Sequence, residues 1–306
     1  MRAWIDRHKA GSPTAPSVYW IHYRASEIAR LFKAETGHVV SHGSIKRLLK
    51  AMGFGYRKMS KNVATGEYAQ RDRQFQIIYQ LIFAMSIGTP ILSIDCKKKE
   101  LIGNLYRAGK CYTKGQTEVF DHDYSHLGEG KVIPHGIYDM LLNKGYMTLG
   151  NSHETADFIC DNLLWWWETY GIHQYPDAKT IFILCDAGGG NGYRHYAFKK
   201  ELLKLAQSIG KNFVICHYPP YASKWNPIEH RLFAHVHTAI KGAVFTDYQI
   251  IKTLIEKTIT EQGLTVVARI LDKEYQIGIK TQKHDIDWDR VKPNLQIPDL
   301  SYFICA

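Results

Sequence analysis

Three acidic residues in this sequence end or begin apolar segments, where a carboxylate can bind a metal ion. Asp95 ends the run Ile91–Asp95, Asp186 ends the run Ile181–Asp186, and Glu229 begins a segment with helical periodicity. Carboxylates that gather in one place repel one another, so either one is protonated or a cation neutralises them. Because no Cys or His stands at ligand spacing beside them, these oxygen donors favour Mg²⁺ or Mn²⁺.

Two such ions about 4 Å apart can activate a water or a sugar hydroxyl and stabilise the leaving oxygen of a phosphodiester. The three acids therefore predict phosphodiester chemistry with two bound ions. The alternative for each acid alone is structural, because an aspartate after a strand often only caps the next turn. Three such acids, in a chain that also has a strongly basic segment, favour the catalytic interpretation.

The sequence around Glu229 predicts the elements that position it. Phe213–Cys216 predicts a buried strand, a Pro-Pro pair follows as a turn, and Ile228–Ile240 predicts a helix. We expect Asn226 to cap that helix, because Asn suits the N-cap position and Pro227 suits the first turn.

The glycine-rich stretch Ala187–Gly192 after Asp186 matches neither common pattern of a nucleotide-binding loop. We expect it to turn the backbone sharply beneath the site, with Gly188 and Gly189 keeping side chains out of the way.

The order of apolar segments predicts an α/β fold. A strand over Thr180–Asp186, a helix over Tyr196–Ile209 and the strand Phe213–Cys216 form a parallel unit. In open α/β sheets, ligands meet the carboxyl ends of the strands, which is where Asp95 and Asp186 fall. Further expectations are an irregular segment over residues 1–20, a helix over Tyr68–Ser86, a hairpin of Leu101–Arg107 with Ile91–Asp95, strands in Gly136–Asp139 and Gly145–Gly150, a helix from a Ser152 cap to Tyr170, a helix over Thr246–Gln262, and alternation in Tyr275–Lys280.

The positive charge of the chain is concentrated at its N-terminal end. The net charge is +10, and residues 1–60 hold eleven Lys or Arg against three Asp or Glu. A helix over Ser26–Thr36 and a second one capped by Ser41 predict a helix-turn-helix, with the second helix presenting His42, Lys46, Arg47 and Lys50. An ordinary helical hairpin is the alternative, and the local charge favours binding of a polyanion such as DNA.

The remaining composition excludes several classes of protein. No apolar run is long enough to span a membrane, and the N-terminus lacks an apolar signal core, so we expect a cytoplasmic protein without a membrane partner. The six cysteines include no Cys-x-x-Cys pair, so neither a zinc site nor a disulfide framework is expected.

Three motifs resemble the Rhodopirellula-type DDE transposases of bacterial insertion sequences: Ile94-Asp-Cys-Lys-Lys-Lys-Glu-Leu101, Asp186-Ala-Gly-Gly-Gly-Asn-Gly192, and His217 to Phe233 with Asn-Pro-Ile-Glu229. The last element is also similar to that of mariner-like transposases. The resemblance implies an RNase H-like mixed sheet flanked by helices, with Asp95, Asp186 and Glu229 as the metal-binding catalytic triad. The sequence ahead of Ser26 is short for the family, which suggests a truncated or naturally shortened transposase.

The resemblance implies a DNA transposase that frees a 3′-hydroxyl at an element end and joins it to target DNA, with double-stranded DNA as partner and a homo-oligomer assembled on it. Candidate phosphate contacts are Lys97, Lys98, Lys224 and Arg231. The alternatives are a catalytically silent DNA-binding protein and a nuclease that only hydrolyses. The expected domains are a helix-turn-helix region (1–60), a connecting helix (61–89), a catalytic domain (90–245) and a C-terminal α/β extension (246–306).

Overall fold

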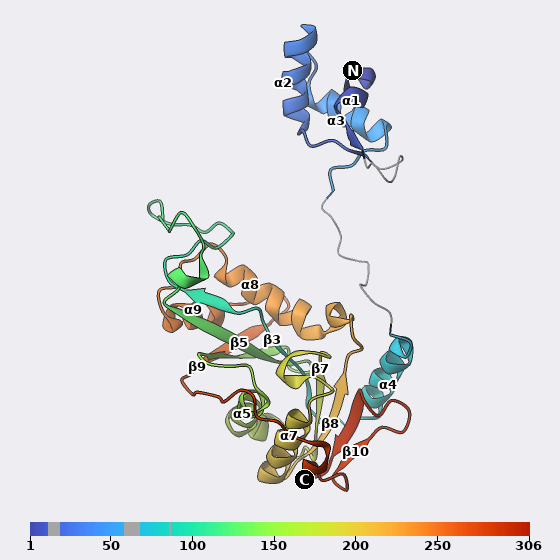
Figure 1. The fold of residues 1–306 in the computed structure, drawn as a ribbon, viewed down its shortest axis with the longest axis vertical. Helices are drawn as coiled ribbons and strands as arrows, with labels where there is room; N and C mark the ends of the chain where they lie inside the picture. Colours follow the sequence, from blue (N-terminus) through green and yellow to red (C-terminus); the bar gives the residue numbers. More distant parts are fainter. Residues whose placement is uncertain (12–18, 58–67, 86) are drawn as a thin grey trace. The chain divides into compact units, whose positions relative to one another are not determined.

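A mixed β-sheet lies at the centre of the larger of two units, Ala64–Ala306 (Figure 1). The structure is a computed structural model that describes residues 1–11, 19–57, 68–85 and 87–306, and over these residues the sheet has nine strands. They are β3 (Ile91–Cys96), β4 (Glu100–Ile102), β5 (Gly130–Asp139), β6 (Lys144–Gly150), β7 (Thr180–Cys185), β8 (Asn212–His217), β9 (Thr265–Leu271), β10 (Val291–Pro293) and β11 (Ser301–Ile304).

The strands run in the order β10-β11-β8-β7-β3-β5-β6-β9, and β4 pairs with β5 outside this path. Strands β3, β7 and β8 are parallel, whereas β5 is antiparallel to both β3 and β6. The five central strands, β8-β7-β3-β5-β6, thus have the arrangement of an RNase H-like fold. The predicted α/β fold with a mixed sheet is confirmed.

Helices cover both faces of the sheet. Alternate residues of β3 point to opposite faces, so that Leu92 and Ile94 pack with α5 and α7, while Ile91 packs with α4. The π-helical turn Glu229–Phe233 (η5), α8 and α9 cover the second face over β5, β6 and β9. The helices of this unit are α4 (Arg71–Ala84), α5 (Ala156–Trp166), a π-helical turn (Trp167–Gly171), α6 (Ile172–Gln174), α7 (Tyr196–Ile209), η5, α8 (Ala234–Ile240) and α9 (Tyr248–Glu256), with short 3₁₀ turns between them.

Three expectations for this unit are wrong. Leu101 does not form a hairpin with β3, because β3 already has β5 and β7 as neighbours, and β4 pairs with the outer part of β5. Thr155 rather than Ser152 caps α5, accepting a hydrogen bond from the Phe158 N–H at 3.2 Å. The alternating segment Tyr275–Lys280 forms no strand.

The C-terminal segment joins the same sheet, because β9 pairs with β6, and β11 pairs with β8. The proposed domain boundaries at residues 60, 89 and 245 remain predictions. Over the described residues, no helix is long and apolar enough to cross a membrane.

The smaller unit, Met1–Val63, is helical over most of its described residues. It contains α1 (Arg2–His8), the short strands β1 (Ala10–Gly11) and β2 (Tyr19–Trp20), α2 (Ala25–Thr36) and α3 (His42–Ala51). The expectation of an irregular segment is wrong for Arg2–His8, where Trp4 and Ile5 are buried against α2 and α3. Residues 12–18 of the segment expected to be irregular lie outside the described residues.

The two helices predicted in this unit are present. The Ser41 side chain caps α3 by accepting a hydrogen bond from the Ser44 N–H at 3.1 Å, and Gly37 ends α2 in a left-handed conformation. Ile28, Phe32 and Ile45 are buried between the helices, so their packing sets how α2 and α3 contact each other.

Candidate active site

The first acidic residue, Asp95, lies near the end of β3 and is 9% exposed. Its Oδ1 accepts a hydrogen bond from the Cys96 N–H at 2.8 Å, and its Oδ2 accepts one from Asn226 Nδ2 at 3.3 Å. Both oxygens therefore have protein donors that fix the carboxylate in one orientation.

The second acid, Asp186, follows β7 directly. Because β7 is parallel to β3 and Ile94 lies opposite Cys185, the two aspartates leave the sheet at the same end. Asp186 Oδ1 accepts a hydrogen bond from the Gly188 N–H at 3.2 Å. The Asp186 carbonyl lies 3.0 Å from Nδ1 of His217, a fully buried side chain at the end of β8.

The third acid, Glu229, begins a π-helical turn that lies flat against the sheet. This turn packs on β5 at Gly136, where a Cβ would lie 2.6 Å from Cε1 of Phe233 and 2.9 Å from Cδ1 of Ile228. Gly136 is the residue opposite Asp95 in the register of β3 and β5. The missing side chain at Gly136 thus brings the start of this turn close to Asp95. Short π-helical segments within helices are frequent at functional sites.

Asn226 occupies the position before this helix, but its side chain does not cap it. Asn226 is fully buried and accepts a hydrogen bond from Ser93 Oγ at 2.5 Å while donating to Asp95. The Ile228 N–H, a free donor of the first helical turn, is satisfied by Ser93 Oγ at 3.2 Å. The capping prediction is therefore wrong about the side chain, because Ser93 on β3 supplies the cap and Asn226 joins the helix to Asp95.

The two predicted glycines differ in what they do. Gly188 has an ordinary extended backbone and supplies its N–H to Asp186. Gly189 has a φ of +68°, and a Cβ there would lie 2.5 Å from Glu154 Oε1. Only Gly189 therefore needs to be glycine for steric reasons, since φ > 0 and the close carboxylate both disfavour a side chain.

Glu154 lies near the start of the segment expected to form a helix from Ser152 to Tyr170 and was not among the expected site residues. Glu154 lies just before α5, and its Oε1 accepts a hydrogen bond from the Gly190 N–H at 3.2 Å. Together with Gly189 and Gly190 it lines a cavity of about 410 Å³ beside the Asp186 loop. Its position was hidden in the sequence because the contact joins segments 36 residues apart.

The acids influence one another electrostatically. Burial, followed by the negative charges of Asp186 and Glu229, raises the pKa of Asp95 to about 8, although the Cys96 N–H opposes the shift. Burial also raises the pKa of Asp186 to about 6, with Glu154 and Glu229 adding to it and the Gly188 N–H lowering it. The pKa of Glu229 is raised by burial and lowered by His230 and Lys97. A positive ion between these carboxylates would relieve both the burial cost and the repulsion.

The donor set fits a hard divalent cation, because it offers carboxylate oxygens at the open end of a sheet. Among the described residues, no three His, Cys, Asp or Glu side chains form a ready-made metal cluster.

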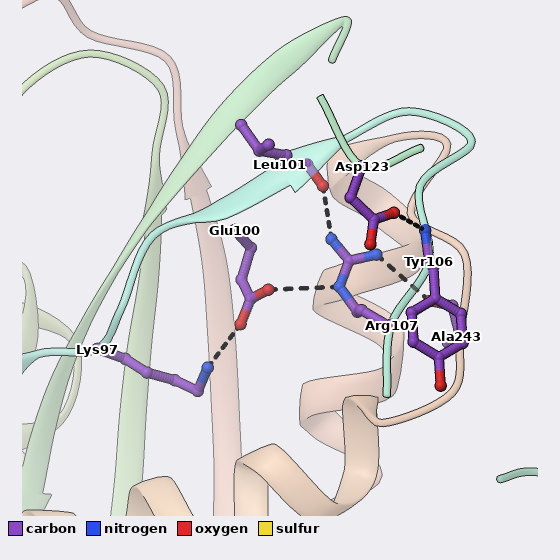
Figure 2. Close-up of polar contacts among 7 residues, drawn as sticks. All are labelled: Lys97, Glu100, Leu101, Tyr106, Arg107, Asp123 and Ala243. Carbon is purple, nitrogen blue, oxygen red and sulfur yellow. Dashed lines mark hydrogen bonds and ion pairs between the residues drawn. The ribbon is translucent and has the colours of Figure 1, made fainter. Parts of the chain in front are cut away.

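Lys97, one of the candidate phosphate contacts, is held by protein partners, as Figure 2 shows. Its ammonium lies 2.7 Å from Glu100 Oε1, and Glu100 Oε2 in turn lies 3.3 Å from Nε of Arg107. Arg107 donates to the carbonyls of Leu101 and Ala243 and so ties the segment after β4 to the one after α8.

The other candidate DNA contacts are exposed. Lys98, Lys224 and Arg231 lie in the larger unit, and His42, Lys46, Arg47 and Lys50 lie on α3 in the smaller unit. Arg47 donates to Ser44 Oγ at 3.1 Å, and the Lys224 ammonium lies 5.5 Å from the centroid of the Trp225 ring.

The sequence matches, over residues 1–306, the model of a protein family described as the Rhodopirellula transposase DDE domain. Three similar solved structures are a Mos1 transposase paired-end complex with the left transposon end (16% identity, 84% of this chain and 78% of that chain, TM-score 0.47), a pre-cleavage Mos1 transpososome (17%, 81% and 72%, TM-score 0.47) and a Mos1 mariner paired-end complex with Mn (16%, 84% and 78%, TM-score 0.46). At these values the structural similarities are too distant to carry an argument about this chain. No curated protein matches the sequence significantly. Because the family match spans the whole chain, the protein belongs to the Rhodopirellula transposase DDE domain family and is a DNA transposase of the insertion-sequence type.

Proposed function

We propose that Asp95, Asp186 and Glu229 form the catalytic triad of this transposase. One observation carries the proposal: two parallel neighbouring strands and the facing helix bring three carboxylates to one end of the sheet, where burial first, and then the charges of Asp186 and Glu229, raise the pKa of Asp95 to about 8. Such clustering of carboxylates with perturbed pKa values is typical of a functional site. The resulting reaction is hydrolysis at an element end, followed by attack of the freed 3′-hydroxyl on target DNA.

The three acids would hold Mg²⁺ or Mn²⁺, and we propose two ions. When bound, they would activate the attacking oxygen and stabilise the leaving oxygen of the phosphodiester. The protein orients the carboxylates through its own donors: Asn226 and the Cys96 N–H hold Asp95, and the Gly188 N–H holds Asp186. Ser93 holds the start of the Glu229 helix through the Ile228 N–H.

We propose that α3 provides most of the DNA contacts of the smaller unit through its exposed basic residues. Lys98, Lys224 and Arg231 are the corresponding proposal for the larger unit, since all three are exposed. Lys97 would act through Glu100 and Glu229 rather than by direct phosphate contact, because its ammonium is paired with Glu100. Assembly as a homo-oligomer on DNA, in the bacterial cytoplasm, completes the proposal.

The experiment is DNA cleavage and strand transfer with labelled duplexes that carry the DNA flanking the coding sequence, in Mn²⁺ and in EDTA. Asp95→Asn, Asp186→Asn and Glu229→Gln should each abolish cleavage and leave DNA binding intact. Their effects should be non-additive, because residues that act as a unit lose nearly all activity at the first substitution. Asp177→Asn is the matched control, since Asp177 is an exposed aspartate in the turn before β7, at the other end of that strand from Asp186.

Cleavage in EDTA, or full cleavage by any triad variant, would show that the triad assignment is wrong. Cleavage without joined products in Mn²⁺ would identify a nuclease that only hydrolyses. DNA binding without cleavage by the unaltered chain would identify the catalytically silent alternative.

A further inference from the structure

A second cavity, of about 740 Å³, opens beside the loop that carries Asp186. The residues that matter here are Tyr193, Arg194, Tyr196, Lys199, Trp288 and Tyr302, which come from the start of α7 and from the C-terminal segment. This volume lies within the range typical of small-molecule sites. No role in the triad or in the predicted DNA contacts involves these side chains.

One buried side chain, His217, connects this cavity to the active site. Its Nδ1 lies 3.0 Å from the Asp186 carbonyl oxygen, and its Nε2 lies 3.2 Å from the Tyr302 hydroxyl. The Tyr193 ring lies 6.3 Å from the His217 ring between centroids. A single imidazole therefore separates Tyr302 in the wall of the cavity from the backbone of Asp186.

The cavity combines aromatic rings with cations. Tyr196 and Trp288 meet edge to face at 6.3 Å between ring centroids. The Arg194 guanidinium lies 5.0 Å from the Tyr193 ring centroid, and the Lys199 ammonium lies 4.8 Å from that of Tyr302. Flat apolar rings beside cations match a ligand with a planar base and an anionic phosphate.

Lys199 is the most unusual of these cations, because only 7% of it is exposed. Its ammonium donates to the Tyr193 carbonyl, and among the described residues it forms no ion pair. Burial lowers the pKa of Lys199 to about 8, whereas the negative charge of Asp299, an exposed residue that also lines the cavity, acts in the opposite direction. A buried positive charge without a carboxylate at contact distance favours the entry of an anion.

We propose that this cavity binds one unpaired nucleotide of the DNA strand that enters the active site, with its base against the aromatic rings and its phosphate at Arg194 and Lys199. The inference rests on the proposed function, which brings that strand to Asp186. The nucleotide must be unpaired, because a base within a duplex is covered on both faces by its neighbours. Only a base outside the stack can lie on Tyr or Trp rings.

The test measures binding of the full chain in EDTA, where cleavage does not interfere, by fluorescence anisotropy. One probe is a blunt DNA hairpin, and the other is the same hairpin with a three-nucleotide 3′ overhang that contains 2-aminopurine. Stacking of one base on protein rings is expected to make the overhang probe bind roughly tenfold more tightly and to quench its 2-aminopurine fluorescence.

Two substitutions should reduce this preference to less than about twofold. Trp288→Ala removes a ring, with circular dichroism as the check on folding, and Arg194→Ala removes an exposed cation without disturbing the core. Lys257→Ala is the matched control, because Lys257 is exposed beyond the end of α9 and does not line the cavity. It should leave the preference for the overhang unchanged.

Equal affinity for the two probes, or a preference that survives both substitutions, would overturn the inference. So would an abasic overhang that binds as tightly as the base-bearing one, since phosphate alone would then be recognised. Free dAMP that binds as tightly as the overhang would also overturn it, by identifying a free nucleotide as the ligand. The proposed function can fail while this inference holds. If the chain does not cleave DNA in Mn²⁺ but prefers the overhang probe in a way that depends on Arg194 and Trp288, the triad assignment is rejected and the nucleotide-binding cavity is retained.

Discussion

Asp95 is the most buried of the three acids and shows best what a metal ion would do here. Its carboxylate has hydrogen-bond donors, yet burial, together with the charges of three other acids, raises its pKa. A group with this environment is stable in the folded protein either as the neutral acid or as a carboxylate beside a cation. Its titration therefore reports on the metal site without any enzymatic assay.

The first prediction concerns the stability of the metal-free protein. The pKa of Asp95 rises from its ordinary value of 3.8 to about 8, so that between these values the folded chain holds a proton that the unfolded chain has lost. The free energy of unfolding should therefore fall as the pH rises from 5 to 8. Asp95→Asn removes this loss and should raise Tm at pH 8 in EDTA by about 2 °C or more, with little change at pH 5.

Circular dichroism melts at both pH values, with Asp177→Asn as control, measure this effect. Mg²⁺ should raise the Tm of the unaltered chain at pH 8 and should have little effect on Asp95→Asn. Equal melting temperatures for the unaltered chain and Asp95→Asn at pH 8 in EDTA would mean that ionised Asp95 does not destabilise the metal-free protein.

The second prediction concerns the hydrogen bonds between Ser93, Asn226 and Asp95. Asn226→Ala leaves buried groups of Ser93 and Asp95 without partners and should cost about 1–3 kcal/mol of stability. Ser93→Ala also removes the cap of the Ile228 N–H. Ser93 and Asn226 are joined by a hydrogen bond, so their effects on stability should not be independent. The double mutant of Ser93 and Asn226 should therefore lose about 0.5–3 kcal/mol less stability than the sum of the two single mutants. Urea denaturation of all four proteins checks this, and strict additivity would show that the bond contributes nothing.

At the scale of elements, the sequence predicted segments far better than their contacts. Strands β3, β7 and β8 were predictable because each is a continuous apolar run buried on both faces. Asn226 looked like a cap because its neighbours in the sequence permit it, whereas its partners lie more than 130 residues away on β3. Helix α1 was missed because seven residues with two buried positions give too little periodicity to detect.

The candidate site was predictable to the same extent. Asp95, Asp186 and Gly188 follow from motifs that are local in sequence, and their place at one end of the sheet could be predicted from the strands that precede them, whereas their catalytic role stays a prediction. Glu154 could not be found in this way, because only the folded chain brings it to Gly190. The ion pair of Lys97 with Glu100 could not be predicted either, because it depends on how the short connection between β3 and β4 folds.

The third prediction concerns the close contact between the Glu229 helix and the sheet. Gly136→Ala places a methyl group 2.6 Å from the Phe233 ring, so the helical turn must shift away from β5. We expect a loss of about 1–3 kcal/mol of stability, as for other overpacked cores. Activity should fall further than stability, because Glu229 lies at the start of the same turn and a misplaced carboxylate loses catalysis steeply.

Thermal melts and cleavage rates, measured together, check this prediction. Phe233→Leu in the Gly136→Ala background should recover part of both losses by giving space to the new methyl group. Gly115→Ala is the control, since a Cβ at Gly115 meets no atom within 4 Å. A Gly136→Ala protein with unchanged rate and Tm would show that the turn does not depend on this contact.

At the scale of the whole molecule, the excess of positive charge and the proposed catalytic acids lie in different units. The acids gather in the unit Ala64–Ala306, and the excess of basic residues lies in residues 1–60. The exposed side chains of α3 include Lys46, Arg47 and Lys50, on a helix whose opposite side packs against α2 through Ile45. If this division holds, the two activities respond to different substitutions.

The last prediction follows from this division. Each phosphate neutralised by a basic side chain releases counterions, so that the logarithm of affinity falls with the logarithm of salt concentration by about 0.9 per contact. Replacing Lys46, Arg47 and Lys50 by Ala should therefore flatten the salt dependence of binding by about two to three units and weaken binding at low salt.

The control of equal charge replaces three exposed residues of the larger unit together: Lys257, Lys280 and Lys292. Anisotropy titrations of one duplex over a salt series compare the three proteins. An unchanged slope in the α3 variant, with a flattened slope in the control, would place the main DNA contacts on the larger unit and reverse the proposed division.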